Sequence, residues 1–272
     1  MKINNLEYKI LLNIVKFLKK EEYQTIQYFP PKFNIFALIK EFENIQNLFF
    51  RKKHLLFYYS IFPKFYYFLL NKRIRNFLKV FYFNKLIKKE EITKFIPKKH
   101  IKSALKFKII SKEKENFRFN LSFIPYKNNI FLRESHNSYT KFFDPKKIKN
   151  KKIWMGADSI MFLRFINKYL KKNSFNSVLE IGSGSGIVIG SISKNFEKCY
   201  AVDLNPKAVK LTSLNAKLNL IDNLQCSKSD LFQKVKNKFD LIISNPWFVD
   251  LKKGGLEQAP KIIEKLKKYL NK

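Results

Sequence analysis

The sequence predicts an α/β protein in which a nucleotide-binding type of parallel sheet follows a helical and winged-helix-like N-terminal region. Three observations support this fold class. Four short apolar segments after residue 177 each end in a glycine-rich or polar turn, as the strands of an open parallel sheet do. All seven glycines lie between Gly156 and Gly255. Residues 1–90, in contrast, carry apolar side chains mainly at helical spacing.

The length and composition indicate two domains and a basic surface. The 272 residues are 46% hydrophobic, which suffices for a packed core. The formal net charge is +34, from 55 Lys and Arg against 21 Asp and Glu. Such a charge attracts polyanions, and RNA or DNA is the natural partner. Lys, Asn, Ile and Phe are also the residues that A/T-rich codons encode, so codon use explains the charge equally well, and both explanations stay open.

The sequence predicts neither a metal site nor a membrane span. Cys199 and Cys226 are too few for a disulfide framework or a zinc site, and the three histidines lie far apart. No secretory signal begins the chain. The most apolar run, 55–70, is interrupted by Pro63 and Lys64 and is shorter than the about 20 residues that a bilayer span needs. We expect a cytoplasmic protein, and nothing in the sequence indicates its oligomeric state.

The N-terminal domain is expected over residues 1–143. Apolar stripes over 10–18 and 38–49 predict helices, and 90–110 predicts two short helices. Two extended segments then follow, 117–126 and 129–135, with a turn at Lys127 and Asn128. Two short helices followed by a basic hairpin is the order of a winged helix. Such a module often binds nucleic acid, but in many proteins it only packs against its neighbour.

A basic linker is expected over 144–152, and the second domain over 153–272. That domain begins with an apolar strand over 178–181, three alternating glycines and a helix from Ile187. Glycines allow a tight turn and let a ligand approach the backbone. The spacing does not fit the dinucleotide fingerprint, because Ile187 or Ile189 would occupy the position of its third glycine. The turn alone is a weak signal, and the next strands strengthen it.

Polar residues follow each of the next three strands. The second strand ends in Asp203, whose carboxylate could accept both hydroxyls of a ribose, and Asn205 and Pro206 then begin a helix. Asp230 ends the third strand, within 224–232. The fourth, within 239–250, ends in Asn-Pro-Trp-Phe at 245–248. Because ligands of open α/β sheets bind at the carboxyl ends of the strands, these residues predict one site.

The order EIGSGSG, AVDLNP, SDLF and ISNPWF resembles class I S-adenosylmethionine-dependent methyltransferases. More narrowly, it resembles the small-domain group, whose fourth strand ends in Asn-Pro-Pro-Tyr or Phe. That group includes rRNA and tRNA amino-methyltransferases, adenine methyltransferases and the release-factor glutamine methyltransferase. The resemblance covers about 154–270, and the N-terminal region resembles what precedes this domain in some bacterial members. It implies a Rossmann-like sheet with S-adenosylmethionine as the cofactor.

The resemblance also implies a role for each motif position. The methionine part of the cofactor would lie at Glu180 and the glycine turn, its ribose at Asp203, and its adenine at Asp230 and Leu231. The acceptor nitrogen would lie at the fourth strand's motif. Trp247 departs from the family's second proline and puts the substrate geometry in doubt. The implied cofactor-binding residues are Glu180, Gly182, Gly184, Gly186, Asp203, Asp230 and Leu231, and the implied catalytic residues are Asn245, Pro246 and Phe248.

These roles lead to three functional hypotheses. Asn245 and the Pro246 carbonyl would hold a planar amino group, and Phe248 would stack on its plane. The leading hypothesis is methyl transfer to an amino nitrogen of a nucleic-acid base in rRNA or tRNA. The first alternative is a protein glutamine N-methyltransferase, since glutamine also presents a planar amide. The second is a relative that binds cofactor or RNA without catalysis.

The sheet implied by the resemblance has seven strands, and here only four are predicted. An amphipathic helix over 254–272 follows the fourth strand, whose apolar edge at 241–243 then lacks a partner. A truncated gene product, completion by another polypeptide, and pairing with an unusual strand from the N-terminal half would each account for this. We favour truncation.

Overall fold

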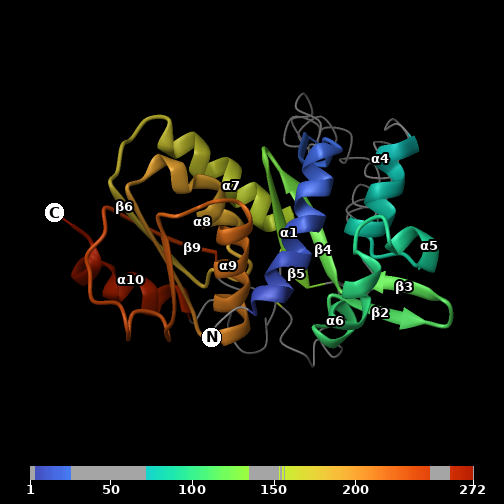
Figure 1. Cartoon of the computed structure of the whole chain (residues 1–272). Coiled ribbons are helices and arrows are strands. Elements are labelled where there is room, and N and C mark those ends of the chain that lie inside the picture. Colours follow the sequence, from blue (N-terminus) through green and yellow to red (C-terminus); the bar gives the residue numbers. More distant parts are fainter. Residues whose placement is uncertain are drawn as a thin grey trace, which may run out of the picture.

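The computed structural model has two parts that lie side by side (Figure 1). One part is a parallel sheet with helices on its faces, and the other combines helices with antiparallel strands. The predicted α/β class is therefore confirmed. The structure describes residues 4–25, 72–134, 153, 155, 157–245 and 258–271.

The C-terminal part contains the four predicted strands, all parallel, in the order β8-β7-β6-β9. The third strand is shorter than predicted and ends two residues before Asp230. The strands are β6 (Ser177–Ile181), β7 (Lys198–Asp203), β8 (Leu224–Lys228) and β9 (Leu241–Ser244). The helices are α7 (Ala157–Leu170), α8 (Ile187–Ile192), α9 (Pro206–Leu218) and α10 (Gln258–Tyr269), with a 3-10 turn, η6, over Ser193–Asn195.

The strand order creates a switch point beside β6. The chain adds β7 and β8 on one side of β6 and then returns to place β9 on the other side. Alternate residues of β6 face opposite sides of the sheet: Val178 joins the core beneath α8 and α9, whereas Leu179 and Ile181 join a cluster that includes Ile262 of α10. Ligands of such sheets bind at the switch point, at the carboxyl ends of the strands.

The N-terminal part contains the predicted first helix, with Ile10, Leu11, Ile14 and Leu18 buried. The predicted helix over 38–49 and the apolar run 55–70 lie outside the described residues. The helical elements are α1 (Asn5–Lys20), η1 (Tyr23–Thr25), α4 (Lys72–Phe77), η2 (Leu78–Tyr82), α5 (Lys89–Ile92), η3 (Lys98–His100) and α6 (Ile101–Lys106). The strands are β1 (Ile87–Lys88), β2 (Ile110–Glu113), β3 (Asn116–Phe119), β4 (Leu121–Tyr126) and β5 (Asn129–Glu134).

The prediction of a single strand over 117–126 is wrong, because the extended conformation is interrupted at Asn120. The Asn120 amide Nδ2 donates to Lys108 O at 3.1 Å, and Ser111 Oγ lies 3.1 Å from Asn120 Oδ1. β3 therefore pairs with β1 and β2, while β4 pairs with β5. The hairpin that directly follows the two short helices is β2–β3. The hairpin that we assigned to a wing, β4–β5, lies between the two parts of the chain, and the winged-helix-like character of the N-terminal region stays a prediction.

Two asparagines of α9 bind β5 in the way that a neighbouring strand would. Asn219 accepts from Ile130 N at 3.0 Å and donates to Ile130 O at 2.9 Å. Asn215 accepts from Leu132 N at 2.7 Å and donates to Leu132 O at 2.9 Å. Four residues of a helix rise about 6 Å, and two residues of a strand advance about 6.6 Å. The two spacings match, so each side-chain amide reaches the outward-facing N–H and C=O of one residue of β5.

Further contacts join the two parts into one core. Lys210 of α9 forms an ion pair with Glu7 of α1 at 3.1 Å. A Cβ on Gly190 would lie 2.9 Å from the Phe131 ring, so a larger residue there would disturb the packing of β5 on α8. Buried apolar side chains run continuously from α1 to β6. The compositional boundary near residue 150 is therefore not a boundary in packing, and the linker predicted over 144–152 lies outside the described residues.

Within the described residues, β9 pairs with β6 alone among the strands. Just before it, Phe239 forms a parallel bridge with Leu270, at the end of α10. No described N-terminal strand adds to this edge, so the third explanation for the open edge has no support in this part of the chain.

None of the helices described here combines the length and the hydropathy that crossing a bilayer requires.

Replacing Asn215 with Ala should lower the free energy of unfolding by about 3 kcal/mol, because it leaves buried peptide groups of Leu132 and the Ser185 carbonyl without partners. A urea titration measures this loss. Asn76→Ala in the exposed face of α4 is the matched control and should change stability by less than about 0.5 kcal/mol. Equal effects of the two substitutions would contradict the strand-like role of Asn215.

Candidate functional site

The turn after β6 depends on its three glycines. Gly182, Gly184 and Gly186 have φ angles of +74°, +57° and +74°, in the left-handed region that favours glycine. A Cβ on Gly186 would lie 2.6 Å from Thr212 Cγ2, so this glycine also permits close packing on α9. A Cβ on Gly182 would meet nothing within 4 Å. The turn is thus tightly packed on one side and open on the other.

Helix α9 fixes the packed side of this turn through hydrogen bonds. Thr212 Oγ1 donates to Gly184 O at 3.3 Å and lies 3.1 Å from Ser183 Oγ. Asn215 Nδ2 donates to Ser185 O at 2.7 Å, in addition to its bonds with β5. Sequence reasoning missed both side chains, because a Thr and an Asn within a helix do not reveal long-range partners.

Asp203 lies at the end of β7, directly beside the glycine turn. Its Oδ2 accepts from Gly184 N at 2.9 Å and its Oδ1 accepts from Asn205 N at 2.8 Å. Each carboxylate oxygen has a second lone pair, so both can still accept a ligand hydroxyl. The expected helix start is confirmed, since Asn205 Oδ1 accepts from Lys207 N and Pro206 is the first residue of α9.

Glu180 lies beneath the turn, where it is only 2% exposed. Its Oε2 accepts from Ile189 N, in the first turn of α8, at 3.2 Å. Burial raises the pKa of Glu180 to about 8; the hydrogen bond from Ile189 opposes this shift, and the charge of Asp203 adds to it. Glu180 is therefore largely protonated at neutral pH and supports the turn from below. Its predicted contact with the cofactor stays a prediction.

The end of β8 contributes Asp230 and Leu231. Asp230 is exposed, and Ser229 N next to it donates to Asp203 O at 3.1 Å, which ties the ends of β7 and β8 together. Leu231 has a φ of +47° and packs against the cluster that contains Phe232. Both residues therefore lie beyond the carboxyl end of β8, which ends earlier than the sequence predicted, and their contact with the adenine stays a prediction.

Asn245 follows β9, on the other side of the switch point. Ser244 pairs with Ile181 in the sheet and donates from Oγ to Ile181 O at 3.0 Å, which places the end of β9 beside the glycine turn. Asn245 Nδ2 donates to Asp158 Oδ2, in the first turn of α7, at 3.3 Å. Sequence reasoning missed Asp158. Pro246, Trp247 and Phe248 lie outside the described residues.

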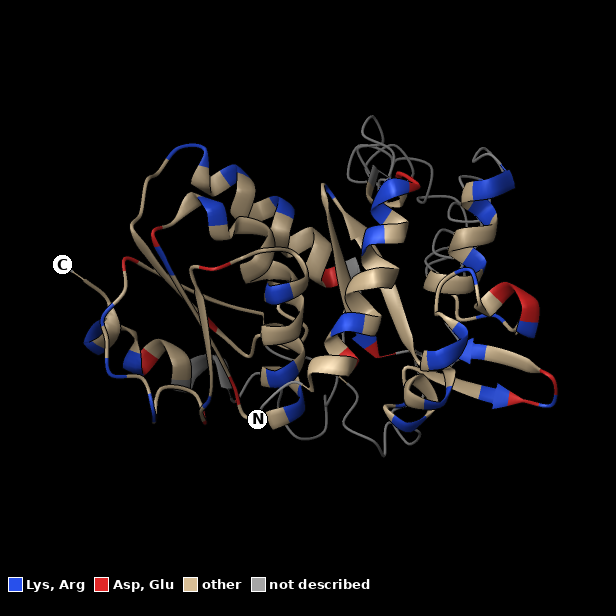
Figure 2. Cartoon of the chain, in the orientation of Figure 1, with Lys and Arg blue, Asp and Glu red and all other residues tan. Residues whose placement is uncertain are grey.

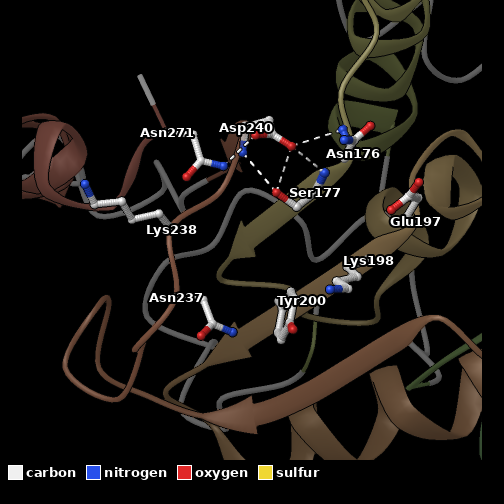
Figure 3. Close-up of a pocket in the computed structure, with 9 residues that line it drawn as sticks. All are labelled: Asn176, Ser177, Glu197, Lys198, Tyr200, Asn237, Lys238, Asp240 and Asn271. Carbon is white, nitrogen blue, oxygen red and sulfur yellow. Dashed lines mark hydrogen bonds between the residues drawn. The ribbon is translucent and has the colours of Figure 1, made fainter.

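A hollow of about 410 Å³ lies at the opposite, amino end of the strands (Figure 3). Asp240 there accepts from the Asn271 side chain and from the backbone and hydroxyl of Ser177, and these bonds, with burial opposing them, lower the pKa of its carboxyl. Asp240 Oδ2 accepts three hydrogen bonds from the protein and Oδ1 accepts one, and no glycine turn opens toward a ligand here. The hollow is lined by Asn176, Ser177, Glu197, Lys198, Tyr200, Asn237, Lys238, Asp240 and Asn271.

Comparison with known proteins shows what the C-terminal part of the chain is similar to. Residues 162–272 match the family model described as methyltransferase small domain. A protein of Methanocaldococcus jannaschii provisionally named protein N5-glutamine methyltransferase is 39% identical over 115 residues, which are 42% of this chain and 51% of that protein. The chain therefore spans about half the length of this relative.

Two further relatives are more distant in identity or shorter in overlap. The release factor glutamine methyltransferase of Clostridium acetobutylicum is 25% identical over 190 residues, 57% of this chain and 65% of that protein. The ribosomal protein L11 methyltransferase of Caldicellulosiruptor bescii is 35% identical over 88 residues, 32% of this chain and 28% of that protein.

The C-terminal part of the chain thus matches the methyltransferase small domain over residues 162–272 and is similar in sequence to class I S-adenosylmethionine-dependent methyltransferases. Its strand ends fit the cofactor of this class. The open space over Gly182 admits a ligand against the backbone, and Asp203 presents free lone pairs beside it. The positions of the individual ligand-contacting residues stay predictions.

The raised pKa of Glu180 predicts a dependence of stability on pH. Between about 4.5 and about 8 the folded chain retains a proton that the unfolded chain has lost, so this residue lowers stability as pH rises, by up to about 1.4 kcal/mol per pH unit. In Glu180→Gln that slope should disappear, whereas Glu197→Gln at an exposed position should keep it. Urea titrations at several pH values measure the slopes. Identical slopes in both variants would refute the assignment.

Replacing Asp203 with Asn should weaken S-adenosylmethionine binding by roughly 10- to 100-fold, because hydrogen bonds to a charged acceptor contribute about 1.5–3 kcal/mol. Asn keeps the side-chain shape and one acceptor for the backbone. Calorimetry measures the affinity, and Asp222→Asn at an exposed position is the control. Wild-type affinity in the Asp203 variant would remove the ribose assignment.

Proposed function

We propose that this chain acts as an N-methyltransferase that transfers a methyl group from S-adenosylmethionine to the side-chain amide nitrogen of a glutamine in a protein. The observation that carries the proposal is the place of Asn245, which ends β9 beside the open glycine turn on the other side of the switch point. A hydrogen-bonding amide at this place suits an acceptor with a planar –NH₂ group.

The relatives favour glutamine over a nucleic-acid base. Two of the three relatives are named for glutamine methylation, and the third for methylation of a ribosomal protein. None of these names supports the leading hypothesis from the sequence, a base of rRNA or tRNA. The protein alternative therefore fits better, since the same planar amide geometry serves both acceptors.

Asp158 supports a defined orientation for the Asn245 amide. Because Asn245 Nδ2 donates to Asp158, the amide oxygen Oδ1 is left to accept from the substrate. An amide nitrogen is a poor nucleophile because its lone pair is delocalised into the carbonyl. A hydrogen-bond acceptor on the amide N–H holds that hydrogen out of the amide plane, so the lone pair is localised on the nitrogen. The residues therefore act by positioning and electrostatics.

S-adenosylmethionine supplies an electrophilic methyl group on a sulfonium centre. The chemistry that it would supply is transfer of this methyl group to the glutamine nitrogen, with an N–C bond formed and the S–C bond broken. The N–H that Asn245 Oδ1 accepts would lose its proton to solvent water, and a neutral N-methylamide would result. Asn245 Oδ1 thereby orients the departing hydrogen, and Asp158 is a positioning residue that keeps Oδ1 toward the substrate.

Asn245→Ala should lower the rate of methyl transfer at least 100-fold, because the acceptor on the substrate N–H is lost. Cofactor affinity should stay within about twofold, since Asn245 lies on the substrate side of the turn. Single-turnover kinetics and calorimetry measure the two quantities. Asn237→Ala, at the amino end of the sheet, is the control. An unchanged rate would exclude Asn245 from the chemistry.

Radiolabel transfer from the methyl donor to a lysate of the same cells tests the acceptor class. We expect label in the protein fraction, recovered as N5-methylglutamine after digestion with proteases, and no label in RNA. Label in RNA alone would restore the nucleic-acid base as the acceptor. Label in neither fraction, from a chain that binds the cofactor, would contradict catalysis by this chain.

A further inference from the structure

The segment that connects α5 to β2 is unusually basic. Residues 92–112 contain seven lysines and no Asp or Glu. Five of these lysines are exposed on η3, on α6 and on the turn that follows, and we name them the α6 lysine face. The α6 lysine face consists of Lys98, Lys99, Lys102, Lys106 and Lys108.

The helical spacing aligns this charge along one side. Lys98, Lys102 and Lys106 follow one another at intervals of four residues through η3 and α6. Ala104 on the inward side is buried, and Leu105 packs against the hydrophobic core. The inward residues fix the helix, so the lysines project into solvent in a row with a spacing of about 6 Å.

The charge of this face is not compensated by neighbouring carboxylates. Glu113 pairs with Arg118 at 2.6 Å, and Glu115 lies 3.7 Å from Lys112. No lysine of the α6 lysine face forms an ion pair with any described residue. In Figure 2 the acidic colour near this region lies on α5, at the tip of the β2–β3 hairpin and at the start of α1, where Glu7 pairs with Lys210. The face therefore attracts an anionic partner.

The α6 lysine face lies at the same end of the molecule as the candidate site. Helix α6 contacts α1, and α1 contacts α9, whose first turn follows Asp203. The ion pair between Glu7 and Lys210 joins the first turn of α1 to the N-terminal half of α9. Figure 1 shows α6 and the start of α1 toward the same, lower end of the view. A partner on this face would thus lie beside the carboxyl ends of the strands.

We propose that the α6 lysine face binds the phosphate backbone of structured RNA. A row of lysines presents point charges that suit phosphates. The exposed positions of α6 carry no Asn, Gln or Arg, which are the side chains that read bases in a DNA major groove. Duplex RNA is recognised through its shape and its phosphates, because its major groove is too narrow for side chains.

The other anionic partners fit less well. A membrane-binding helix needs an exposed apolar side next to its lysines, and the apolar residues of α6 face the core. A folded acidic protein offers scattered carboxylates, whereas RNA offers an unbroken row of charges along each strand. This inference is separate from the methyl acceptor, because binding is measured without the methyl donor.

Fluorescence anisotropy with the full chain and a labelled RNA hairpin tests the proposal. The variant K98E/K102E/K106E should bind at least tenfold more weakly than the wild type at 150 mM salt. The slope of log affinity against log salt should fall by about 2 to 3, since each phosphate contact contributes roughly 0.7–0.9. Circular dichroism verifies folding, and K98Q/K102Q/K106Q replaces the first variant if that one does not fold.

The matched control is K171E/K172E/K194E, which changes the charge by the same amount at the amino end of the strands. These lysines are exposed, and Lys171 and Lys194 are close enough to Lys127 to help lower its pKa, after the larger effect of burial. The control should lose less than threefold. Equal losses in both variants would mean that total charge alone binds RNA and would overturn the proposal. Tighter binding of polyglutamate than of RNA, or no RNA binding by the wild type, would also overturn it.

Discussion

The attachment of helix α9 to the glycine turn is the constraint on which the rest of the structure depends. Thr212 and Asn215 bind the turn from one side, and Gly186 permits the approach because a Cβ there would overlap Thr212. The same Asn215 amide also binds Leu132 of β5. One helical turn therefore sets both the shape of the ligand-binding backbone and the position of the N-terminal part against it.

This double role has a consequence for how the two parts communicate. Side-chain amides take the place of a partner strand along β5, so any displacement of that hairpin breaks buried hydrogen bonds to α9. A ligand that orders the glycine turn would stabilise the same contacts. The N-terminal part is thus held by the ligand-binding end of the sheet, and the α6 lysine face keeps a fixed place relative to the switch point.

Local features of the site could be predicted from the sequence, and long-range ones could not. The positive φ angles of Gly182 and Gly184 and the cap at Asn205 follow from residue types and spacing alone. The partners of Asn215 and Asn219 are 83 and 89 residues away, and a helical Asn looks the same with or without them. Asp158 is likewise 87 residues from Asn245. The break at Asn120 was missed because its side-chain bonds override the extended pattern around it.

The two ends of the parallel sheet offer contrasting places for a ligand. The amino end has the hollow around Asp240, whose oxygens are occupied by Asn176, Ser177 and Asn271. The carboxyl end has the open backbone at Gly182 and the lone pairs of Asp203. We expect the cofactor at the carboxyl end, because the strand order switches direction there.

Amide hydrogen exchange with and without S-adenosylmethionine distinguishes the two ends most directly. We expect added protection in 181–188 and 203–206, with no change in 176–178 and 237–240. Protection that is confined to the residues around Asp240, or absent at the glycine turn in a chain that binds the cofactor, would contradict a site at the β6–β9 switch point.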